Sequence, residues 1–471
     1  MPPSTVGSSY RPRDAAASPL YRAILGSLET YLVERSRQRD TLAQPCAESS
    51  LRAFLECGIA RFGVARFRCK DCGDSRFVPF SCKRRMACPS CDAKRAVVES
   101  GHALEELLAD VPYRQWVLVL PKRLRYFVHR DKRLPGEISR LLAETLTDFH
   151  LRRAAAPKDA APAQFHVLQR FGSSVNLHLH DHAVVSDGVF RLDNGFLRFS
   201  AAAPPTFEEV AELVERLRRR ILKRMLRMRV LPEATVNEML AWPHGGFSLD
   251  GGTYVEAADR AGLERLLLYV LRPALSLKQL VYKPEQDLVT YRPSKGRPDS
   301  PAVLEWTGAE FVGRMAALIP PARKHLVRYY GALGPRSPMR RAVSMAARGK
   351  ATTAELEAGY GVTLLGSSVR AARKAGSAAV RAWAACLRKV FEVYPVLCVK
   401  CGGEMKLVGV ILDDRELDRI LAHQGWPVNF PKPSPARAPP THAPDEDEAD
   451  QTAHPEQWDD RQAWPCGDWP A

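Results

Sequence analysis

The stretch LHLHDHAVV, residues 177–185, places histidine at every second position. Because successive side chains on a β-strand point to opposite faces, His178, His180 and His182 would share one face. The other face is then apolar apart from Asp181. Neutral imidazole is a common metal ligand, and a row of three is hard to bury as core. The pattern therefore predicts a strand with a divalent-metal site on one face.

Turn residues at 172–174 and 186–188 bracket this strand. Apolar periodicity elsewhere predicts an α+β chain. Strands are expected at 115–120, 164–171 and 177–185, a β region at 282–291, and helices within 134–150, 207–229, 257–271 and 308–318.

The composition favours a polyanionic partner. With 471 residues, 45% of them hydrophobic, the chain can bury more than one core. It carries 69 basic and 53 acidic residues, a net charge of +16, although acids dominate from Asp445 onward. The rest is therefore more basic still, which suits nucleic acid. No apolar run reaches the roughly 20 residues that cross a bilayer, and no signal peptide begins the chain, so we expect a cytoplasmic protein without a membrane partner.

Two C-x2-C pairs suggest zinc. Eleven cysteines in a chain without a secretion signal are expected to stay reduced. Cys69 and Cys72 are followed after 15 residues by Cys88 and Cys91, a spacing typical of one tetrahedral zinc. Cys82 lies between the pairs.

Other cysteines leave alternatives open. Cys57, like Cys82, is a candidate substitute ligand, second-site ligand or core residue. A third pair, Cys398 and Cys401, has no partner pair nearby in the sequence, and Cys386 is too isolated to complete it. Half a zinc site and a plain turn are both open interpretations.

Basic residues cluster in two places that are candidates for DNA contact. Arg84 and Arg85 lie between the first two cysteine pairs. The helix expected at 207–229 carries a run of basic residues that lacks acids after Glu215, and this suggests a surface that follows phosphates. Its candidate contacts are Arg219, Lys223 and Arg227.

These motifs resemble the rolling-circle transposases of the insertion-sequence ninety-one family and its ISCR-type relatives, which carry a histidine-hydrophobe-histidine (HUH) motif. The resemblance spans about residues 20–426. The matching stretches are FRCKDCG, FSCKRRMACPSC, VPYRQWVLVLP, QRFGSSVNLHLHDHAVVSDGVF, LLLYVLRPAL, HLVRYYGALGP and CVKCGGEMKLVGVI.

The resemblance implies a fold and a division of the chain. It implies an amino-terminal zinc-binding domain, an HUH-type antiparallel-sheet nuclease core with helices, and a mostly helical carboxy-terminal region. The expected segments are a disordered arm at 1–18, the zinc-binding domain at 19–98, the catalytic domain at 99–335, the carboxy-terminal region at 336–430 and a disordered acidic tail at 431–471.

The resemblance also implies roles for individual residues. Structural zinc maps onto the first two cysteine pairs, and a catalytic Mg²⁺ or Mn²⁺ onto His180 and His182, with His178 as an extra histidine. The nucleophile maps onto Tyr269, which would form a 5′-phosphotyrosine with single-stranded DNA at transposon ends and target, without a second tyrosine. Gln169 and His166 are both candidates for the third metal ligand, and Arg272, just after the tyrosine helix, is expected to contact DNA.

Asp181 departs from the family pattern, where the residue between the paired histidines is apolar. Either Asp181 packs against a polar partner behind the sheet, or the true pair is His178 and His180. The departure also leaves open a degenerate, inactive transposase. Two other functions compete: a non-catalytic zinc-dependent nucleic-acid-binding protein, and a zinc hydrolase, although no H-E-x-x-H helix is present.

Overall fold

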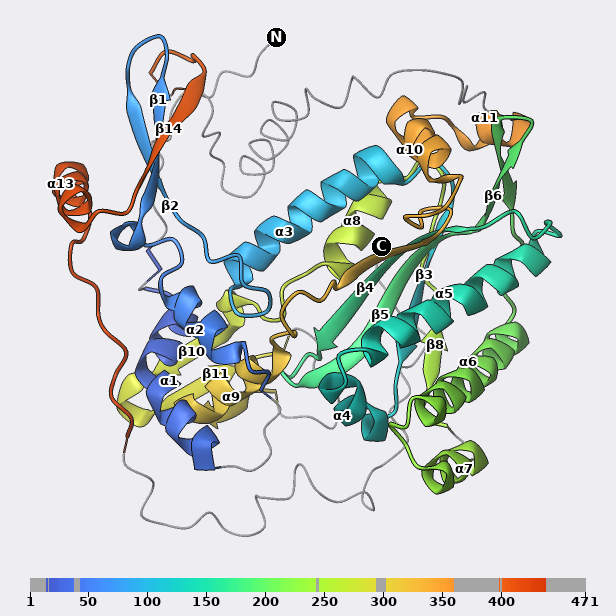
Figure 1. The fold of residues 1–471 in the computed structure, drawn as a ribbon, viewed down its shortest axis with the longest axis horizontal. Coiled ribbons are helices and arrows are strands. Elements are labelled where there is room, and N and C mark those ends of the chain that lie inside the picture. Colours follow the sequence, from blue (N-terminus) through green and yellow to red (C-terminus); the bar gives the residue numbers. More distant parts are fainter. Residues whose placement is uncertain are drawn as a thin grey trace.

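The computed structural model describes residues 14–37 except 16, 43–242, 245–293, 302–359, 398 and 400–437. Its centre is an antiparallel sheet in the order β13-β4-β5-β3-β8, with β9 also paired to β3 (Figure 1). The strands are β3 (Tyr113–Val119), β4 (Ala163–Phe171), β5 (Leu177–Ser186), β8 (Ser248–Asp250), β9 (Tyr254–Val255) and β13 (Val327–Gly331). The strand with the histidine row, β5, is thus internal to the sheet.

Helices cover both faces of the sheet. One face packs against α4 (Lys122–Arg130), α5 (Leu134–Arg153), α6 (Phe207–Arg227) and α7 (Glu233–Ala241). The other face carries α8 (Arg260–Val270), α3 (Pro89–His102), η2 (Ala103–Leu107) and α10 (Arg340–Gly349). Figure 1 shows α5 and α6 on one side of the sheet and α3 and α8 on the other.

Two of the helices, α6 and α9, begin at a capping box. Thr206 accepts a hydrogen bond from the Glu209 backbone N–H, while the Glu209 side chain accepts from the Thr206 backbone, which forms a capping box at the start of α6. Thr307 and Glu310 form the same box at α9 (Gly308–Leu318). These reciprocal bonds satisfy N–H groups that a helix start otherwise leaves unpaired.

A second core lies beside the sheet and joins distant parts of the chain. Helices α1 (Pro19–Arg37), α2 (Ala47–Leu55) and α9 pack with the sheet of β10 (Leu280–Lys283), β11 (Leu288–Tyr291) and β12 (Leu304–Thr307). Cys57, Cys88 and Cys91 belong to the same apolar cluster. The expected boundary between residues 98 and 99 therefore does not separate two cores, because residues 274–319 complete the amino-terminal one.

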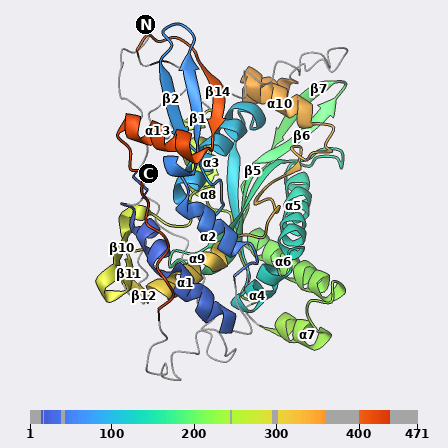
Figure 2. The same cartoon turned by 60° about the vertical axis from the view of Figure 1, so that its left-hand side comes forward.

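A third unit is a small ribbon. Strand β14 (Met405–Ile411) pairs with β1 (Val64–Cys69), which pairs with β2 (Ser75–Pro79), and α13 (Asp414–Gln424) packs on η1 (Ala60–Phe62). Figure 2 shows β14 and α13 beside the amino-terminal strands. Residues 405–424 thus belong with the amino-terminal ribbon rather than with a separate carboxy-terminal domain.

The remaining described elements lie at the edges. The hairpin of β6 (Gly188–Asp193) and β7 (Phe196–Ala201) turns at Asn194 and Gly195, both with positive φ, as a tight hairpin turn requires. Short elements complete the fold: α11 (Thr353–Ala358), η3 (Leu277–Gln279) and η4 (Pro284–Gln286).

Most of the expected elements are confirmed. The strands expected at 115–120, 164–171 and 177–185 are β3, β4 and β5, and the helix at 308–318 is α9 with the same bounds. The tail expected from Pro431 is partly described: Ser434 donates its backbone N–H to the Leu25 carbonyl over 3.0 Å. Residues 1–13 of the expected arm, Cys386 and residues 438–471 lie outside the described residues.

His150 on α5 is buried without a hydrogen-bond partner at either ring nitrogen. Its ring packs edge-on against Trp116 and Phe149. Burial lowers the pKa of His150 to about 4, so the ring is neutral in the folded protein at pH 5.

We predict that this histidine makes the fold less stable in acid. Below pH 6.5 the unfolded ring takes up a proton that the folded ring refuses until about pH 4, so stability falls as pH falls through this window. The full loss is about 3 kcal/mol for such a shift. Urea unfolding at pH 7 and pH 5 should show a smaller acid loss for His150→Phe than for the parent. His102→Phe, at an exposed histidine, should leave the loss unchanged; an equal loss in parent and His150→Phe contradicts the assignment.

Candidate active site and cysteine clusters

The alternation on β5 separates the histidines from the apolar residues, as the sequence predicts. Leu179, Ala183 and Val185 are buried in the core shared with α4–α7. The histidines point to the face on which α8 lies, and the ring of His182 meets the ring of Tyr269 edge-on at a centroid distance of 5.9 Å. The histidine row and the tyrosine helix therefore face each other.

His180 is held in the protonation state that a metal ligand needs. Its Nδ1 lies 2.9 Å from the His178 carbonyl oxygen, which accepts the Nδ1 proton and leaves the lone pair on Nε2. Burial lowers the pKa of His180 to about 4, and the positive charges of Arg272 and Arg125 add to this shift. The ring is thus neutral at pH 7, and its Nε2 lone pair is available to bind a metal.

His182 has an unused ring nitrogen. Its Nδ1 lies 2.6 Å from Gln115 Nε2 on β3, and its buried Nε2 has no hydrogen-bond partner. An amide nitrogen and oxygen exchange places by a half-turn of the carboxamide, and Gln115 turned in this way would accept the Nδ1 proton and leave the lone pair on Nε2. Burial lowers the pKa of His182 well below its usual value, and the neighbouring His180 adds to the shift. A metal at Nε2 would satisfy this orphaned atom.

Gln169 presents an amide oxygen to the same face. It lies opposite His180 in the β4–β5 register, and its Nε2 donates to the Val270 carbonyl at the end of α8 over 2.7 Å. That bond fixes the carboxamide and leaves the buried Oε1 without a partner. His166, the other candidate for third ligand, is on the opposite face, so the structure brings Gln169 and not His166 to the histidines.

Arg272 adds positive charge beside the tyrosine. Its guanidinium carbon lies 5.3 Å from the Tyr269 ring centroid and 5.2 Å from that of Phe171. Its buried Nε has no hydrogen-bond partner. A guanidinium held between two rings retains donors for an anion.

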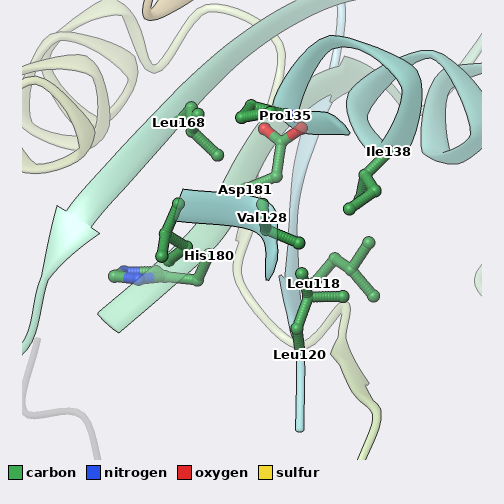
Figure 3. A pocket seen from close by; sticks show the side chains of 9 residues that line it. Leu118, Leu120, Val128, Pro135, Ile138, Leu168, His180 and Asp181 are labelled. Atoms are coloured by element: carbon green, nitrogen blue, oxygen red, sulfur yellow. The ribbon is translucent and has the colours of Figure 1, made fainter. Parts of the chain in front are cut away.

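Asp181 lies behind the sheet, away from the histidines. Its Oδ2 is 3.3 Å from His166 Nδ1, and Ser139 Oγ is 3.3 Å from the same nitrogen. Burial raises the pKa of Asp181, but His166 and Ser139 lower it by more, so the carboxyl is ionised. Figure 3 shows its carboxylate directed towards Pro135 while the ring of His180 points away from it. The first alternative of the sequence analysis is therefore confirmed: Asp181 packs against a polar partner.

His178 does not complete a three-histidine site. Among the described residues, groups of three or more His, Cys, Asp or Glu ligand atoms within 4.8 Å of one another occur only in two cysteine clusters. The rings of His178 and His180 pack edge-on, 4.9 Å between centroids. The available donors are therefore His180, His182 and Gln169.

The cysteines do not group as the sequence suggested. Cys88 and Cys91 lie with Cys57 and Cys82, whereas Cys69 and Cys72 lie with Cys398 and Cys401. The expected single site of Cys69, Cys72, Cys88 and Cys91 is wrong because β1 carries its pair to the far end of the ribbon, where it meets the carboxy-terminal pair.

The first cluster, which we call the helix cluster, is Cys57, Cys82, Cys88 and Cys91. The Sγ atom of Cys91 lies 3.6 Å from that of Cys57 and 3.7 Å from that of Cys82, and the Sγ atoms of Cys57 and Cys88 are 3.7 Å apart. Four sulfurs bound tetrahedrally at about 2.3 Å from zinc stand about 3.8 Å apart, so the residues fit the ion. Cys82 is thus a member of a cluster, as expected, and Cys57 is the ligand that the spacing could not assign.

The predicted DNA contacts lie apart from the histidines. Arg216, Arg220 and Arg224 of α6 pair with Asp148, Glu144 and Glu137 of α5, so much of the basic run stabilises helix packing. Arg219 pairs with Glu215, while Lys223 and Arg227 are exposed on the face of the sheet opposite to the histidines. Ion pairs with acidic residues distant in the sequence therefore explain much of the basic run on α6 better than a continuous phosphate-binding surface does.

The arginines of the cysteine module have different environments. Arg84 is exposed. Arg85 donates to the Lys324 carbonyl and lines a cavity of about 220 Å³ together with Gln169, Arg272 and His325. The structure therefore brings Arg85 and Arg272 to one cavity next to the histidine face.

Comparisons with known proteins show that parts of the chain are similar to transposases. Residues 29–120 match the family described as "Transposase zinc-binding domain", and residues 164–341 match the family described as "Putative transposase". A relative from Sinorhizobium fredii (strain NBRC 101917 / NGR234), described as "Putative transposase y4qJ", is 29% identical over 322 residues, which cover 64% of this chain and 78% of the relative. No solved structure is a significant match. Among the described helices, none is long and apolar enough to cross a membrane.

The membership of Cys57 in the helix cluster leads to a prediction about its replacement. We expect Cys57→Ser to lower the zinc content by one ion per chain and to lower the melting temperature, because this cluster forms part of the amino-terminal core. Cys46→Ser is the matched control, since Cys46 belongs to neither cysteine cluster and its Sγ donates to the Pro320 carbonyl. Elemental analysis of the purified full chain measures the zinc. Unchanged zinc in Cys57→Ser contradicts the assignment.

Proposed function

We propose that the chain is a transposase of the insertion-sequence ninety-one family and that it cuts and rejoins single-stranded DNA through a 5′-phosphotyrosine at Tyr269. The observation that carries the proposal is the meeting of three groups on one sheet face. His182 Nε2 and Gln169 Oε1 are buried without partners, and the ring of Tyr269 lies against His182. This arrangement suits metal-assisted transesterification.

The donor set fits a divalent ion such as Mg²⁺ or Mn²⁺. His180 Nε2, His182 Nε2 and Gln169 Oε1 would hold it and leave positions for water and phosphate. Such an ion, when bound, would polarise a phosphoryl oxygen of the scissile phosphate. The residues around it supply orientation: the His178 carbonyl and Gln115 fix the two imidazoles, and the Val270 carbonyl fixes Gln169.

Tyr269 is the proposed nucleophile that attacks the phosphorus. Its Oη would form a new bond to phosphorus while the bond from phosphorus to the 3′ oxygen breaks. The tyrosine gives up its proton, and the departing 3′ oxygen gains one, so the products are a 5′-phosphotyrosine and a free 3′ hydroxyl. The phosphodiester energy is retained in the covalent intermediate, which makes rejoining possible without a nucleotide cofactor.

Arg272 and Arg85 are the arginines best placed to bind the DNA backbone near this step. Both line the cavity beside Gln169, and Arg272 has an unpartnered Nε close to the Tyr269 ring. Guanidinium groups bind phosphate with two parallel N–H donors. Arg84, Arg219, Lys223 and Arg227 would contact DNA farther from the histidines.

We predict that Tyr269→Phe abolishes the covalent DNA adduct while DNA affinity changes little, because only a hydroxyl is lost. The protein, single-stranded DNA containing a transposon end and Mn²⁺ are incubated, then separated on a denaturing gel. Tyr329→Phe is the matched control, since Tyr329 lies on β13 and packs against the same apolar cluster as Tyr269. An adduct at the parent level in Tyr269→Phe would falsify the assignment of the nucleophile.

A second prediction separates the histidines. His182→Ala should lose most of the stimulation by Mn²⁺, and of the order of 10²-fold or more in nicking rate, because charge stabilisation at the phosphate is lost. His178→Ala should retain both, since its backbone carbonyl, which orients His180, is unchanged. Titration of Mn²⁺ against the nicking rate measures the effect. If His178→Ala is as impaired as His182→Ala, the ligand pair is instead His178 and His180.

A further inference from the structure

The second cysteine cluster brings together two segments that lie far apart in the sequence. We call Cys69, Cys72, Cys398 and Cys401 the ribbon cluster. Cys69 and Cys401 Sγ are 3.4 Å apart, as are Cys72 and Cys398 at 3.5 Å, although the partners are separated by 332 and 326 residues in sequence. These separations are close to the roughly 3.8 Å of four sulfurs around one zinc.

The two halves of the ribbon cluster have the same backbone shape. In each, the N–H of the first cysteine donates over 2.8 Å to the carbonyl five residues later, Cys69 to Asp74 and Cys398 to Gly403. In each, the glycine after the second cysteine is left-handed, with φ of 72° at Gly73 and 73° at Gly402. A side chain is strained at such a φ, so glycine permits this turn. Two matching turns that present two sulfurs each form the tetrahedral arrangement of a zinc ribbon.

The two turns of the ribbon cluster meet closely. A Cβ on Gly403 would stand 2.0 Å from Asp71 Oδ2 and 3.2 Å from Cys69 Sγ, so a side chain there would displace the Asp71 carboxylate and crowd the sulfur. Lys70 pairs with Glu404 over 2.9 Å, and Lys400 with Asp74 over 2.7 Å, so the lysine of each turn pairs with a carboxylate of the other. These ion pairs link the two halves of the cluster.

The ribbon has only two small apolar clusters among the described residues. The one at the cysteine end buries Phe67, Cys69, Cys398 and Met405, and the one beside α13 buries Ala60, Val64, Leu417 and Leu421. The outward side chains of β14 are exposed, with Leu407 57% and Val410 56% accessible. Closing a loop of more than 300 residues costs chain entropy that such a core offsets poorly. A metal bond at this point supplies the missing stabilisation.

We propose that the ribbon cluster binds a second zinc ion, which fastens the carboxy-terminal strap, residues 398–437, to the amino-terminal ribbon. The other end of the strap is fastened without metal: Arg437 pairs with Asp287, its N–H donates to Thr30 Oγ1 over 3.0 Å, and Phe430 packs near Phe62. Figure 1 shows the strap running from α13 past α1. The zinc thus sets where the strap begins, and its role is independent of the cutting chemistry.

The test measures zinc in the full chain. The parent should contain two zinc ions per chain, and Cys398→Ser should contain one while retaining the helix-cluster zinc. Cys401→His should keep both, because histidine is an alternative zinc ligand and Cys401 is exposed. Limited proteolysis should cut the strap of Cys398→Ser, but not that of the parent or of Cys401→His, while the sheet core resists in all three.

Two results would overturn the proposal. One is a parent with a single zinc ion that Cys57→Ser removes and Cys398→Ser does not. The other is a disulfide between Cys69 and Cys401, or between Cys72 and Cys398, found by mass spectrometry of the unreduced protein prepared anaerobically. If both zinc ions are present but Tyr269→Phe still forms the adduct, only the proposed chemistry fails and the strap assignment stands.

Discussion

The alternation of side chains along β5 is the constraint on which the candidate site depends. A strand inside a sheet has no freedom to turn one residue to the other face without moving all of them. His180 and His182 therefore must share a face, and Asp181 between them must enter the core behind it. The core accommodates this carboxylate with His166 and Ser139, at the cost of desolvating an ionised group. The polar residue in the middle of the motif is thus a feature of packing and not of the metal site.

The parts of the molecule that follow from local pattern could be predicted. Period-two alternation located β5, apolar spacing located α6, and the turn signals at 172–174 and 186–188 bracketed β5. That the histidines share one face of the sheet also followed from the alternation. The sequence could offer Gln169 only as one of two candidates for the third metal ligand, because choosing between Gln169 and His166 requires the strand register.

Features set by distant contacts were missed. Each C-x2-C pair indicates a turn, but the fold decides which turns meet. Here Cys69 and Cys72 meet the pair at 398–401 instead of the expected pair at 88–91. The usable signal was the glycine that follows both Cys72 and Cys401, and its absence after Cys91. Part of the basic run on α6 was similarly overinterpreted, since Arg216 and Arg224 pair with acids of α5 that lie about 70 to 90 residues earlier. Nor could spacing place α9 in the same core as α1.

Two glutamines show how the sheet divides structural and chemical work within one side chain. Gln169 uses its amide nitrogen to bind the end of the tyrosine helix and keeps its oxygen on the histidine face. Gln115 uses its carboxamide on His182 Nδ1, and the buried Nε2 of that ring is left without a hydrogen-bond partner on the histidine face. Because an amide offers a donor and an acceptor on one rigid plane, fixing one atom orients the other. The orphaned atoms are therefore consequences of bonds that hold α8 and β3 in place, so the geometry that leaves ligands free is the same geometry that positions Tyr269.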